Sequence, residues 1–318
     1  MNNYINENIY NDKLVEQIIN YENHDLIAIN NLLNYENTNI TNNLTDSSLQ
    51  DQLVNNIICD NINCDNICDS AWDDAINDNK FILNNKIIRI FPQLKNVNNY
   101  SKLKIDDDSL SYITIREIAD LTSKIICHHL IKYNINPQKV TIVDYTSGVG
   151  GNVLSFCKYF NKIYAIELSK IRYENLINNI DVYGFKNTYC INDSSINFTY
   201  NELEKIHADV VFIDPPWGGS EYKSSDSLRL MLGEKPIEEL TIDIFNIFLK
   251  NYKKLKETTN EKNNTKFVIL KLPKNYDIEH LYYYIQEHNN IENHIICIYL
   301  YILNKMLIVV FEFFNIIS

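Results

Sequence analysis

Features that mark secreted proteins are scarce in this sequence. The 318 residues contain seven cysteines, an odd number that forms no paired framework of disulfide bonds. The N-terminus, MNNYINENIY, lacks the basic and apolar segments of a secretory signal peptide. We therefore expect an intracellular protein of the nucleus or the cytoplasm, not a secreted one.

Basic residues are also in the minority, with 29 Lys and Arg against 41 Asp and Glu and a net charge of −12. That balance is unusual for an enzyme of nucleic acids. The acidity is uneven, however, because residues 1–100 hold 14 acidic and 5 basic residues, whereas residues 101–318 hold 27 and 24. The near-neutral part permits a local basic groove, and the acidic part is a candidate surface for a protein partner.

Long uninterrupted apolar runs are missing as well. The most apolar stretch, residues 295–317, is broken by Asn304, Lys305 and Glu312. A membrane-spanning helix needs about 20 residues with few or no charges, so two strands joined by a turn fit this stretch better. We expect no membrane association, and we expect a monomer.

The chain divides into three parts by pattern. Residues 1–95 form an acidic, Asn-rich extension whose apolar residues recur at loosely helical spacing, so we expect it to be partly helical or poorly ordered. Residues 96–135 form a small helical lead-in segment, with a helix over 114–132 and Thr114 as its N-cap. Residues 136–318 form the main domain.

Three cysteines lie close together in the extension, at positions 59, 64 and 68. A structural zinc site needs paired Cys or His ligands, and no second pair follows nearby. We therefore predict no metal site.

Strands and helices alternate through the main domain. The pattern predicts strands at 140–144, 163–167, 189–191, 208–213 and 267–270, and helices from 151, at 169–182, at 236–256 and at 277–288. Such alternation is typical of an α/β fold with a doubly wound, mostly parallel sheet, here with a C-terminal antiparallel hairpin.

The first chemical motif runs from Asp144 to Asn152, where a strand ends in an acid and a glycine turn opens a helix. Glycine is rare, 7 residues in the chain, yet three of the seven fall in this turn. Glycines here let the backbone pass close to a ligand, so Asp144, Gly148 and Gly150 are candidate cofactor residues. The alternative is a strand–helix turn without a ligand.

Two more acids end the next two strands. Glu167 lies 23 positions after Asp144, the position of an acid that accepts both hydroxyls of a ribose. Asp193 can accept the exocyclic amine of an adenine. Each also has an ordinary interpretation, since Glu is common near helix N-termini and Asn-Asp-Ser is common in turns.

The fourth motif is Asp214-Pro215-Pro216-Trp217-Gly218-Gly219, directly after a predicted strand. Prolines remove backbone donors and leave carbonyl acceptors beside the carboxylate. Asp214 and the Pro215 carbonyl can accept the two N–H bonds of an exocyclic amine and hold it in line for attack on a methyl group. Trp217 offers a flat ring for stacking, with a cation–π contribution for a positively charged base. The alternative is a proline turn with a buried Trp.

This motif resembles the Pro-Pro-Trp-Gly-Gly run of trimethylguanosine synthases, the RNA cap guanine-N2 methyltransferases. Other matching runs support the resemblance, which covers about residues 103–313: Leu103–Asp106, Thr114–Ala119, Asp144–Asn152, Val182-Tyr183-Gly184, Glu221-Tyr222, Leu272-Pro273-Lys274-Asn275 and Leu303-Asn304-Lys305.

The resemblance implies a class I, Rossmann-like methyltransferase that uses S-adenosylmethionine and acts on the 7-methylguanosine of a capped RNA. Asp214 and Pro215 are then catalytic. The cofactor residues are Thr114, Asp144, Gly148, Gly150, Glu167 and Asp193. The cap-binding residues are Trp217 and Tyr222 for the base, and Lys104 and Lys274 for the phosphates.

Some residues depart from the family pattern. Thr146-Ser147 stand where Phe-Cys is frequent, Lys274 replaces an Arg, and Asp214 stands where cellular members often have Ser. Asp-Pro-Pro also occurs in methyltransferases of internal guanine N2 or adenine N6 in RNA or DNA, which is the alternative activity. A non-catalytic cap- or RNA-binding subunit is the alternative from another class.

Overall fold

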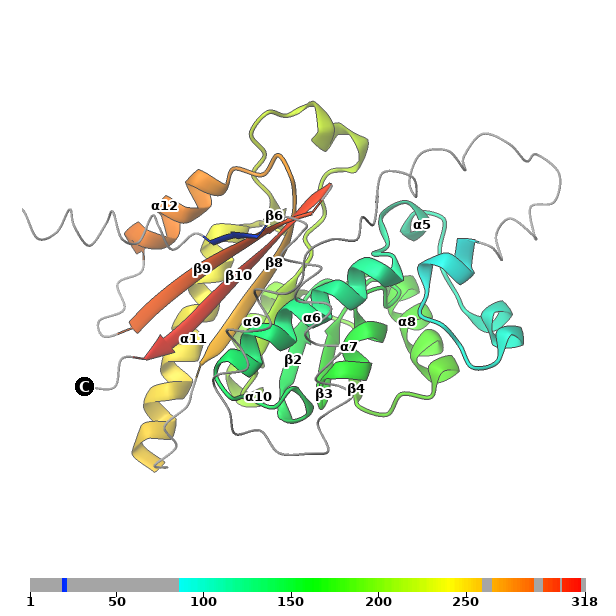
Figure 1. Cartoon of the computed structure of the whole chain (residues 1–318), viewed down its shortest axis with the longest axis horizontal. Coiled ribbons are helices and arrows are strands. Elements are labelled where there is room, and N and C mark those ends of the chain that lie inside the picture. The colour runs from blue at the N-terminus through cyan, green and yellow to red at the C-terminus, as the bar shows by residue number, and fades with distance from the viewer. Residues whose placement is uncertain (1–18, 22–85, 259–264, 289–293, 304, 316–318) are drawn as a thin grey trace, which may run out of the picture.

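The computed structural model describes residues 19–21, 86–258, 265–288, 294–303 and 305–315 (Figure 1). Its centre is an eight-stranded sheet in the order β1-β9-β10-β8-β5-β2-β3-β4. These strands are β1 (Ile19–Tyr21), β2 (Thr141–Asp144), β3 (Lys162–Ile166), β4 (Thr188–Ile191), β5 (Val210–Ile213), β8 (Lys266–Pro273), β9 (His294–Ile302) and β10 (Met306–Asn315). A separate pair consists of β6 (Met231–Leu232) and β7 (Lys235–Pro236).

The strand order creates a switch point beside β2. The chain runs from β2 outwards through β3 and β4, all parallel, and then returns to the other side of β2 with β5. The carboxyl ends of β2 and β5 therefore flank the crevice where ligands bind in open α/β sheets. β8 continues the parallel part, whereas β10 is antiparallel to both β8 and β9. This is the predicted Rossmann-like fold, with β9 and β10 as the predicted C-terminal hairpin.

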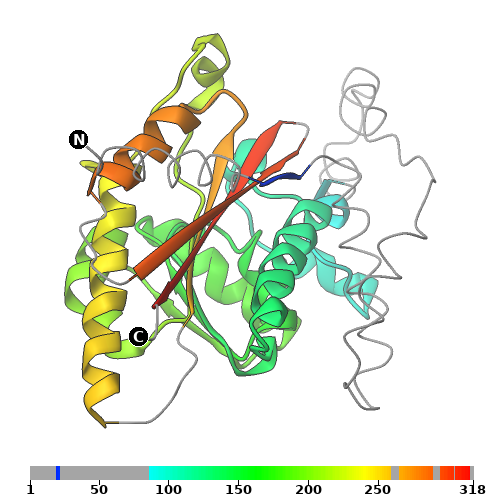
Figure 2. The same ribbon diagram turned by 60° about the vertical axis from the view of Figure 1, so that its left-hand side comes forward.

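Helices cover both faces of the sheet (Figures 1 and 2). One face carries α6 (Arg116–Lys132), α7 (Val153–Tyr159) and α8 (Lys170–Tyr183), and the other carries α9 (Ser195–Asn201), α10 (Leu203–Ile206), α11 (Ile237–Thr258) and α12 (Ile278–His288). The lead-in segment adds the 3-10 helix η2 (Val97–Lys102) and α5 (Ser109–Tyr112). Two further 3-10 helices are η3 (Pro137–Lys139) and η4 (Gly219–Ser224).

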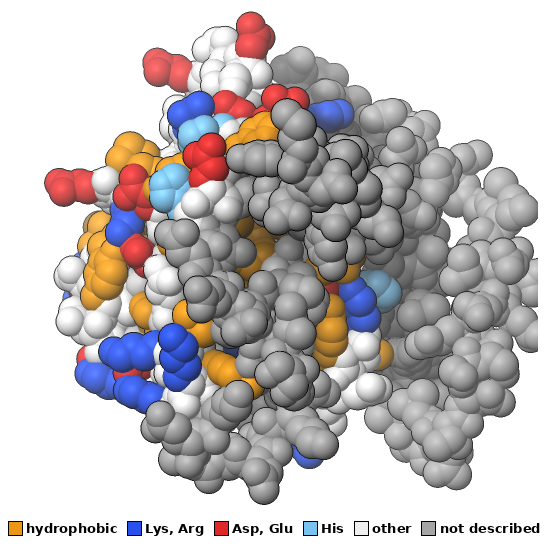
Figure 3. Space-filling view, turned by 90° about the vertical axis from the view of Figure 1, so that its left-hand side faces the viewer, with side chains coloured by type: hydrophobic (Ala, Val, Ile, Leu, Met, Phe, Trp, Pro, Cys, Tyr) orange, Lys and Arg blue, Asp and Glu red, His pale blue; other side chains and the backbone are white. Residues whose placement is uncertain are grey.

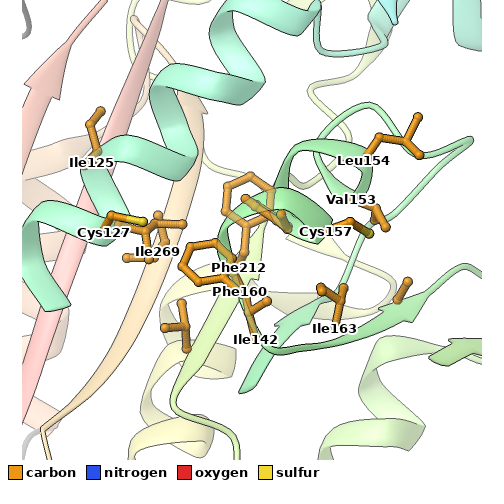
Figure 4. Close-up of a cluster of buried hydrophobic side chains, with 14 of the residues drawn as sticks. Ile125, Cys127, Ile142, Val153, Leu154, Cys157, Phe160, Ile163, Phe212 and Ile269 are labelled. Carbon is orange, nitrogen blue, oxygen red and sulfur yellow. The ribbon is translucent and has the colours of Figure 1, made fainter. Parts of the chain in front are cut away.

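Two apolar clusters form the core because strand side chains alternate between the faces. On β5, Val210 and Phe212 pack on the α6–α8 side, and Val211 and Ile213 on the α11 side. Figure 4 shows the first cluster, where Phe212 lies between side chains of α6 and α7. Burial on both faces explains why the central strands are nearly continuous apolar runs.

The predicted strands and long helices are present, with shifted ends. The predicted N-cap at Thr114 is wrong: α6 begins at Arg116 after Ile115, without a side-chain cap. The Thr114 hydroxyl instead bonds to side chains of the sheet and of the glycine turn. The short helices α9 and α10 were not predicted.

The N-terminal extension lies largely outside the described residues, including its three clustered cysteines. Residues 19–21 are described, and they form a strand parallel to β9, not the helix that the spacing suggested. An edge strand such as β9 presents unpaired backbone groups that can fix a short segment as a strand. Residues 86–90 are helical, and Phe91 is fully buried in the core. The boundary at residue 95 stays a prediction.

On the α11 and α12 side of the surface, Figure 3 shows one cluster of basic side chains and, apart from it, a region where acidic, basic and His side chains are mixed. α11 supplies Lys250 and Lys254, which both pair with Glu204 of α10. These lysines therefore do not form an unopposed basic groove.

In the part of the chain that the structure describes, no helix is both long and apolar enough to cross a membrane.

Candidate active site

The switch point brings the glycine turn and the Asp-Pro-Pro motif together. The backbone N–H of Tyr145 donates to the Phe212 carbonyl at 2.9 Å, which extends the pairing of β2 with β5. The backbone N–H of Asp214 donates to the Thr146 hydroxyl at 2.8 Å. Two motifs 70 positions apart in the sequence thus form one site at the carboxyl edge of the sheet.

Asp144 is fully buried at the centre of this edge. Its Oδ1 accepts the Thr146 backbone N–H at 3.0 Å, whereas its Oδ2 has no hydrogen-bond partner among the described residues. Burial raises the pKa of this carboxyl to about 8; the nearby Asp214 and Glu167 raise it too, whereas the Thr146 N–H and Lys271 lower it. Asp144 is therefore an unsatisfied group at the crevice.

The glycine turn is open on one side and packed on the other. Gly148 has φ +53°, and a Cβ built there would have no atom within 4 Å, so the turn faces free space at this point. Gly150 instead faces the core, because its Cβ would lie 3.1 Å from Leu176 of α8. A Cβ on Gly151 would come within 2.9 Å of the Thr114 carbonyl, so glycine lets the lead-in segment pack on the turn.

Glu167 holds the open side of the turn. Its two carboxylate oxygens accept the backbone N–H groups of Gly148 at 2.8 Å and Ser169 at 2.7 Å. Each oxygen retains a second acceptor position. Asn192 ties the next strand end to this one by donating to the Glu167 carbonyl at 2.8 Å. Asp193 accepts the Ser194 N–H at 2.7 Å, so all four predicted acids lie at the same sheet edge.

A buried lysine joins the two motifs. Lys271 of β8 is 3% exposed, and its Nζ donates to Asp214 Oδ2 at 2.5 Å and to the Thr114 hydroxyl at 2.9 Å. The same hydroxyl accepts an N–H of Asn152 at 3.1 Å. Thr114 is thus close to the predicted cofactor residues, but through its side chain and within a network centred on Lys271.

Trp217 and Tyr222 follow the prolines and contact each other edge to face, with ring centroids 5.2 Å apart. Lys271 Nζ lies 5.5 Å from the Trp217 ring centroid, and the buried indole N–H has no partner among the described side chains and backbone groups. Asn275 fixes this loop because its amide donates to the carbonyls of Tyr222 and Ser225 at 2.7 and 2.6 Å.

The two lysines predicted to meet phosphates are exposed. Lys274 follows β8, and Lys104 belongs to the lead-in segment. Asn179 of α8 accepts the backbone N–H of Lys104 at 2.7 Å and donates to the carbonyls of Lys104 and Val149 at 2.8 and 2.9 Å. It therefore ties the Lys104 segment to the glycine turn. Neither ammonium group forms an ion pair with the residues that the structure describes.

Sequence analysis missed Lys271, Asn179 and Asn275 as parts of the site. The signal for Lys271 was present: it is a charged residue inside the apolar run FVILKLP of a strand that is buried along its whole length. A lysine there needs a partner, and the end of the neighbouring strand supplies Asp214. Asn275 belongs to the run Leu272–Asn275 that resembles the family, but that run did not indicate its contact with the Trp217 loop. Asn179 had no signal, since asparagine is abundant throughout the chain.

Comparisons with known proteins found one family model and several similar proteins. The sequence model of a family described as RNA cap guanine-N2 methyltransferase matches residues 139–315. An uncharacterized protein of Acanthamoeba polyphaga mimivirus is 36% identical over 209 residues, which cover 61% of this chain and 75% of that protein. The trimethylguanosine synthase of Schizosaccharomyces pombe is 26% identical over 175 residues, 49% of this chain and 66% of that protein. Among solved structures, an rRNA methylase from Streptococcus thermophilus matches with a TM-score of 0.36 and 15% identity, covering 59% of this chain and 95% of that one.

Proposed function

We propose that this chain, which belongs to the RNA cap guanine-N2 methyltransferase family, methylates the exocyclic N2 amine of a 7-methylguanosine cap on RNA. Family membership confirms the resemblance found in the sequence, and it makes the chain a methyltransferase with S-adenosylmethionine as its methyl donor. The observation that carries the finer proposal is the junction of the glycine turn, the Asp214 carboxylate and Trp217 at one switch point.

The residues at the glycine turn fit the donor. Asp144 Oδ2 and Asn152 Oδ1 are buried oxygens without a partner among the described residues, and S-adenosylmethionine carries an ammonium group that can donate to such atoms. The Glu167 oxygens have acceptor positions left for the ribose hydroxyls, and Gly148 leaves free space beside them. Asp193 stands further along the same edge for the adenine amine.

The residues after β5 fit an amine as acceptor. Lys271 and Thr114 occupy Asp214 Oδ2, at 2.5 and 3.4 Å, and no described residue donates to Oδ1 or to the Pro215 carbonyl. These two oxygens can accept the two N–H bonds of an exocyclic amine and align its lone pair. Both directly follow β5, whose four residues are all buried.

Trp217 supports a purine ring as the flat part of the substrate. Stacking on an aromatic side chain contributes about 1–3 kcal/mol per base, and a cationic base adds a cation–π contribution. The Asp214 carboxylate lies three positions before Trp217, and its partner Lys271 is the one ammonium that the described residues place over the indole ring. A cationic base such as 7-methylguanine is therefore better suited to the site than a neutral guanine.

When bound, S-adenosylmethionine supplies a methyl group on a sulfonium; transfer breaks the sulfur–methyl bond, forms the bond to N2 and leaves a neutral thioether. Asp214 Oδ1 accepts the proton that N2 loses as it gains the methyl group. The chain thus contributes alignment, exclusion of water and one proton acceptor.

The experiment offers the protein three substrates with isotope-labelled donor: a 7-methylguanosine-capped dinucleotide, the same dinucleotide without the 7-methyl group, and an uncapped oligonucleotide containing unpaired guanine and adenine. Mass spectrometry should find one or two methyl groups on N2 of the 7-methylguanosine-capped dinucleotide, and none on the other two substrates. Equal methylation of the two dinucleotides would contradict the proposal that the site prefers a cationic base.

An internal guanine or adenine is the second candidate, and Asp214 favours it because Asp-Pro-Pro also suits those amines. The uncapped oligonucleotide decides between them. Methylation of the uncapped oligonucleotide alone would show that the substrate is an internal base and not the cap.

A further inference from the structure

Lys271 is an unusual residue for its position. It lies on β8, whose eight residues are all buried, and only 4% of its side chain is exposed. The last paired residues of β5 and β8 are Ile213 and Leu270, so Asp214 and Lys271 follow side by side. A buried ion pair seldom adds stability compared with apolar residues of similar size, because both charges lose their hydration. Packing alone therefore does not account for a lysine here.

The contacts of Lys271 divide the Asp214 carboxylate into two unequal oxygens. The ammonium and the Thr114 hydroxyl both approach Oδ2, which leaves Oδ1 as the oxygen for an incoming amine. Without the ammonium, only the Thr114 hydroxyl, at 3.4 Å, would hold Oδ2, and the neighbouring Asp144 carboxyl would lose a compensating charge. Either change would disturb the oxygen that must accept an N–H bond.

We propose that Lys271 is a positioning residue of the methyl-transfer reaction, which holds Asp214 Oδ2 so that Oδ1 is aimed at the target amine. This inference rests on the proposed function of Asp214 as the acceptor of amine N–H bonds. Lys271 also anchors Thr114, and Thr114 accepts from Asn152 at the start of α7. The same network therefore fixes Asp214 relative to the glycine turn that binds the donor.

The chain offers a matched control on the same two strands. Lys266, at the other end of β8, is also buried and pairs with Asp209 at the start of β5, with 2.7 Å between Nζ and Oδ1. It lies at the opposite edge of the sheet from the active site. Lys266→Met removes a similar ion pair, so it reports the structural cost of losing one without touching Asp214.

The test compares wild type, Lys271→Met, Lys271→Arg and Lys266→Met in methylation kinetics. Misplacement of a reacting group by about 1 Å can cost about 100-fold in rate. We expect Lys271→Met to lower kcat, measured at saturating donor, by about 100-fold, and to change the donor Kd by a smaller factor. Lys271→Arg, which restores a donor to Oδ2, should recover at least about tenfold of that loss, and Lys266→Met should stay within about twofold of wild type. Equal kcat in the two Met variants would overturn the proposal.

A crystal structure of Lys271→Met supplies a readout that needs no substrate. We expect the Asp214 carboxylate to rotate away from its wild-type orientation; an unchanged orientation would overturn the inference whatever the substrate is. Failure of this inference about Lys271 can be distinguished from failure of the cap proposal. If wild type methylates an internal base and not the cap, the cap proposal fails, and the kinetic comparison of the variants is made on that base.

Discussion

The Asp144 carboxyl yields a quantitative prediction about donor binding. Its burial at the centre of the site raises its pKa to about 8, so at pH 6 it is ionised in only about 1% of molecules, and at pH 8 in about half. The groups that face it are Asp214 and Glu167, which raise this pKa, and Lys271 and the Thr146 N–H, which lower it. The free protein at neutral pH therefore holds Asp144 mostly protonated.

The donor is a cation, so it binds better to the ionised form. When only a fraction of molecules is competent, the apparent Kd rises by the inverse of that fraction. The donor Kd should therefore fall by up to about 50-fold between pH 6 and pH 8, and binding at pH 6 should release about one proton. Calorimetry in buffers of different ionisation enthalpy measures both the Kd and the proton count.

Asp144→Asn is the control for this experiment. Asn resembles the protonated carboxyl in shape and cannot ionise, so the variant should bind the donor at every pH about as weakly as wild type does at pH 6. The donor's own amine also titrates in this range, and the difference between wild type and variant cancels its contribution. A donor Kd that changes less than about threefold in wild type from pH 6 to pH 8, with no proton released, would refute the reasoning.

Three further predictions follow from the contacts of the site. Asp214→Ala should lower kcat at least about 1,000-fold with little change in the donor Kd, because it removes both alignment and the proton acceptor; calorimetry and single-turnover kinetics measure the two effects, and a kcat within about tenfold of wild type would contradict them. Trp217→Ala should weaken binding of the 7-methylated cap analogue about tenfold or more by loss of stacking, with a smaller effect on the analogue without the methyl group; fluorescence titration measures both, and equal losses would contradict the cation argument. The pH dependence of stability should differ between wild type and Asp144→Asn. In wild type the native pKa of Asp144 lies above the unfolded value of 3.8, so the stability that the protonated carboxyl contributes is complete below about pH 4 and is lost as pH rises towards 8. The Tm of Asp144→Asn relative to wild type should therefore rise over that range, and a constant difference would contradict the sign.

Much of the fold was predictable because its signals are local. The apolar runs that alternate with helical patterns reflect the burial of central strands such as β5 and β8 on both faces, and a sequence displays that directly. The ends of elements were less predictable. Thr114 is a residue type that commonly forms an N-cap. Its hydroxyl instead accepts hydrogen bonds from the buried ammonium of Lys271 and the side-chain amide of Asn152. Residues 19–21 show the same limit, since pairing with β9 decided their structure.

The motifs of the site were also visible in the sequence. Asp144 and Glu167 could be assigned from the spacing of acids and glycines, and Asp214 with Trp217 from the residue types that follow β5. The roles of these residues as cofactor-, amine- and cap-binding groups remain predictions. Sequence reasoning did not anticipate Asn275, which holds the Trp217 loop from a strand end more than 50 positions away.

The sequence by itself determined which motifs the chain carries: a glycine turn after an acid, an Asp-Pro-Pro run and the aromatic residue that follows it, because each is a short run of residues that can be recognised from its immediate neighbours. Only the tertiary structure decided how these runs act together. The crossover from β4 back to β5 places Asp144 beside Asp214, and the parallel pairing of β5 with β8 places Lys271 against that carboxylate. Contacts of this kind join residues far apart in the chain, and they arise from strand order and register, which no local pattern specifies.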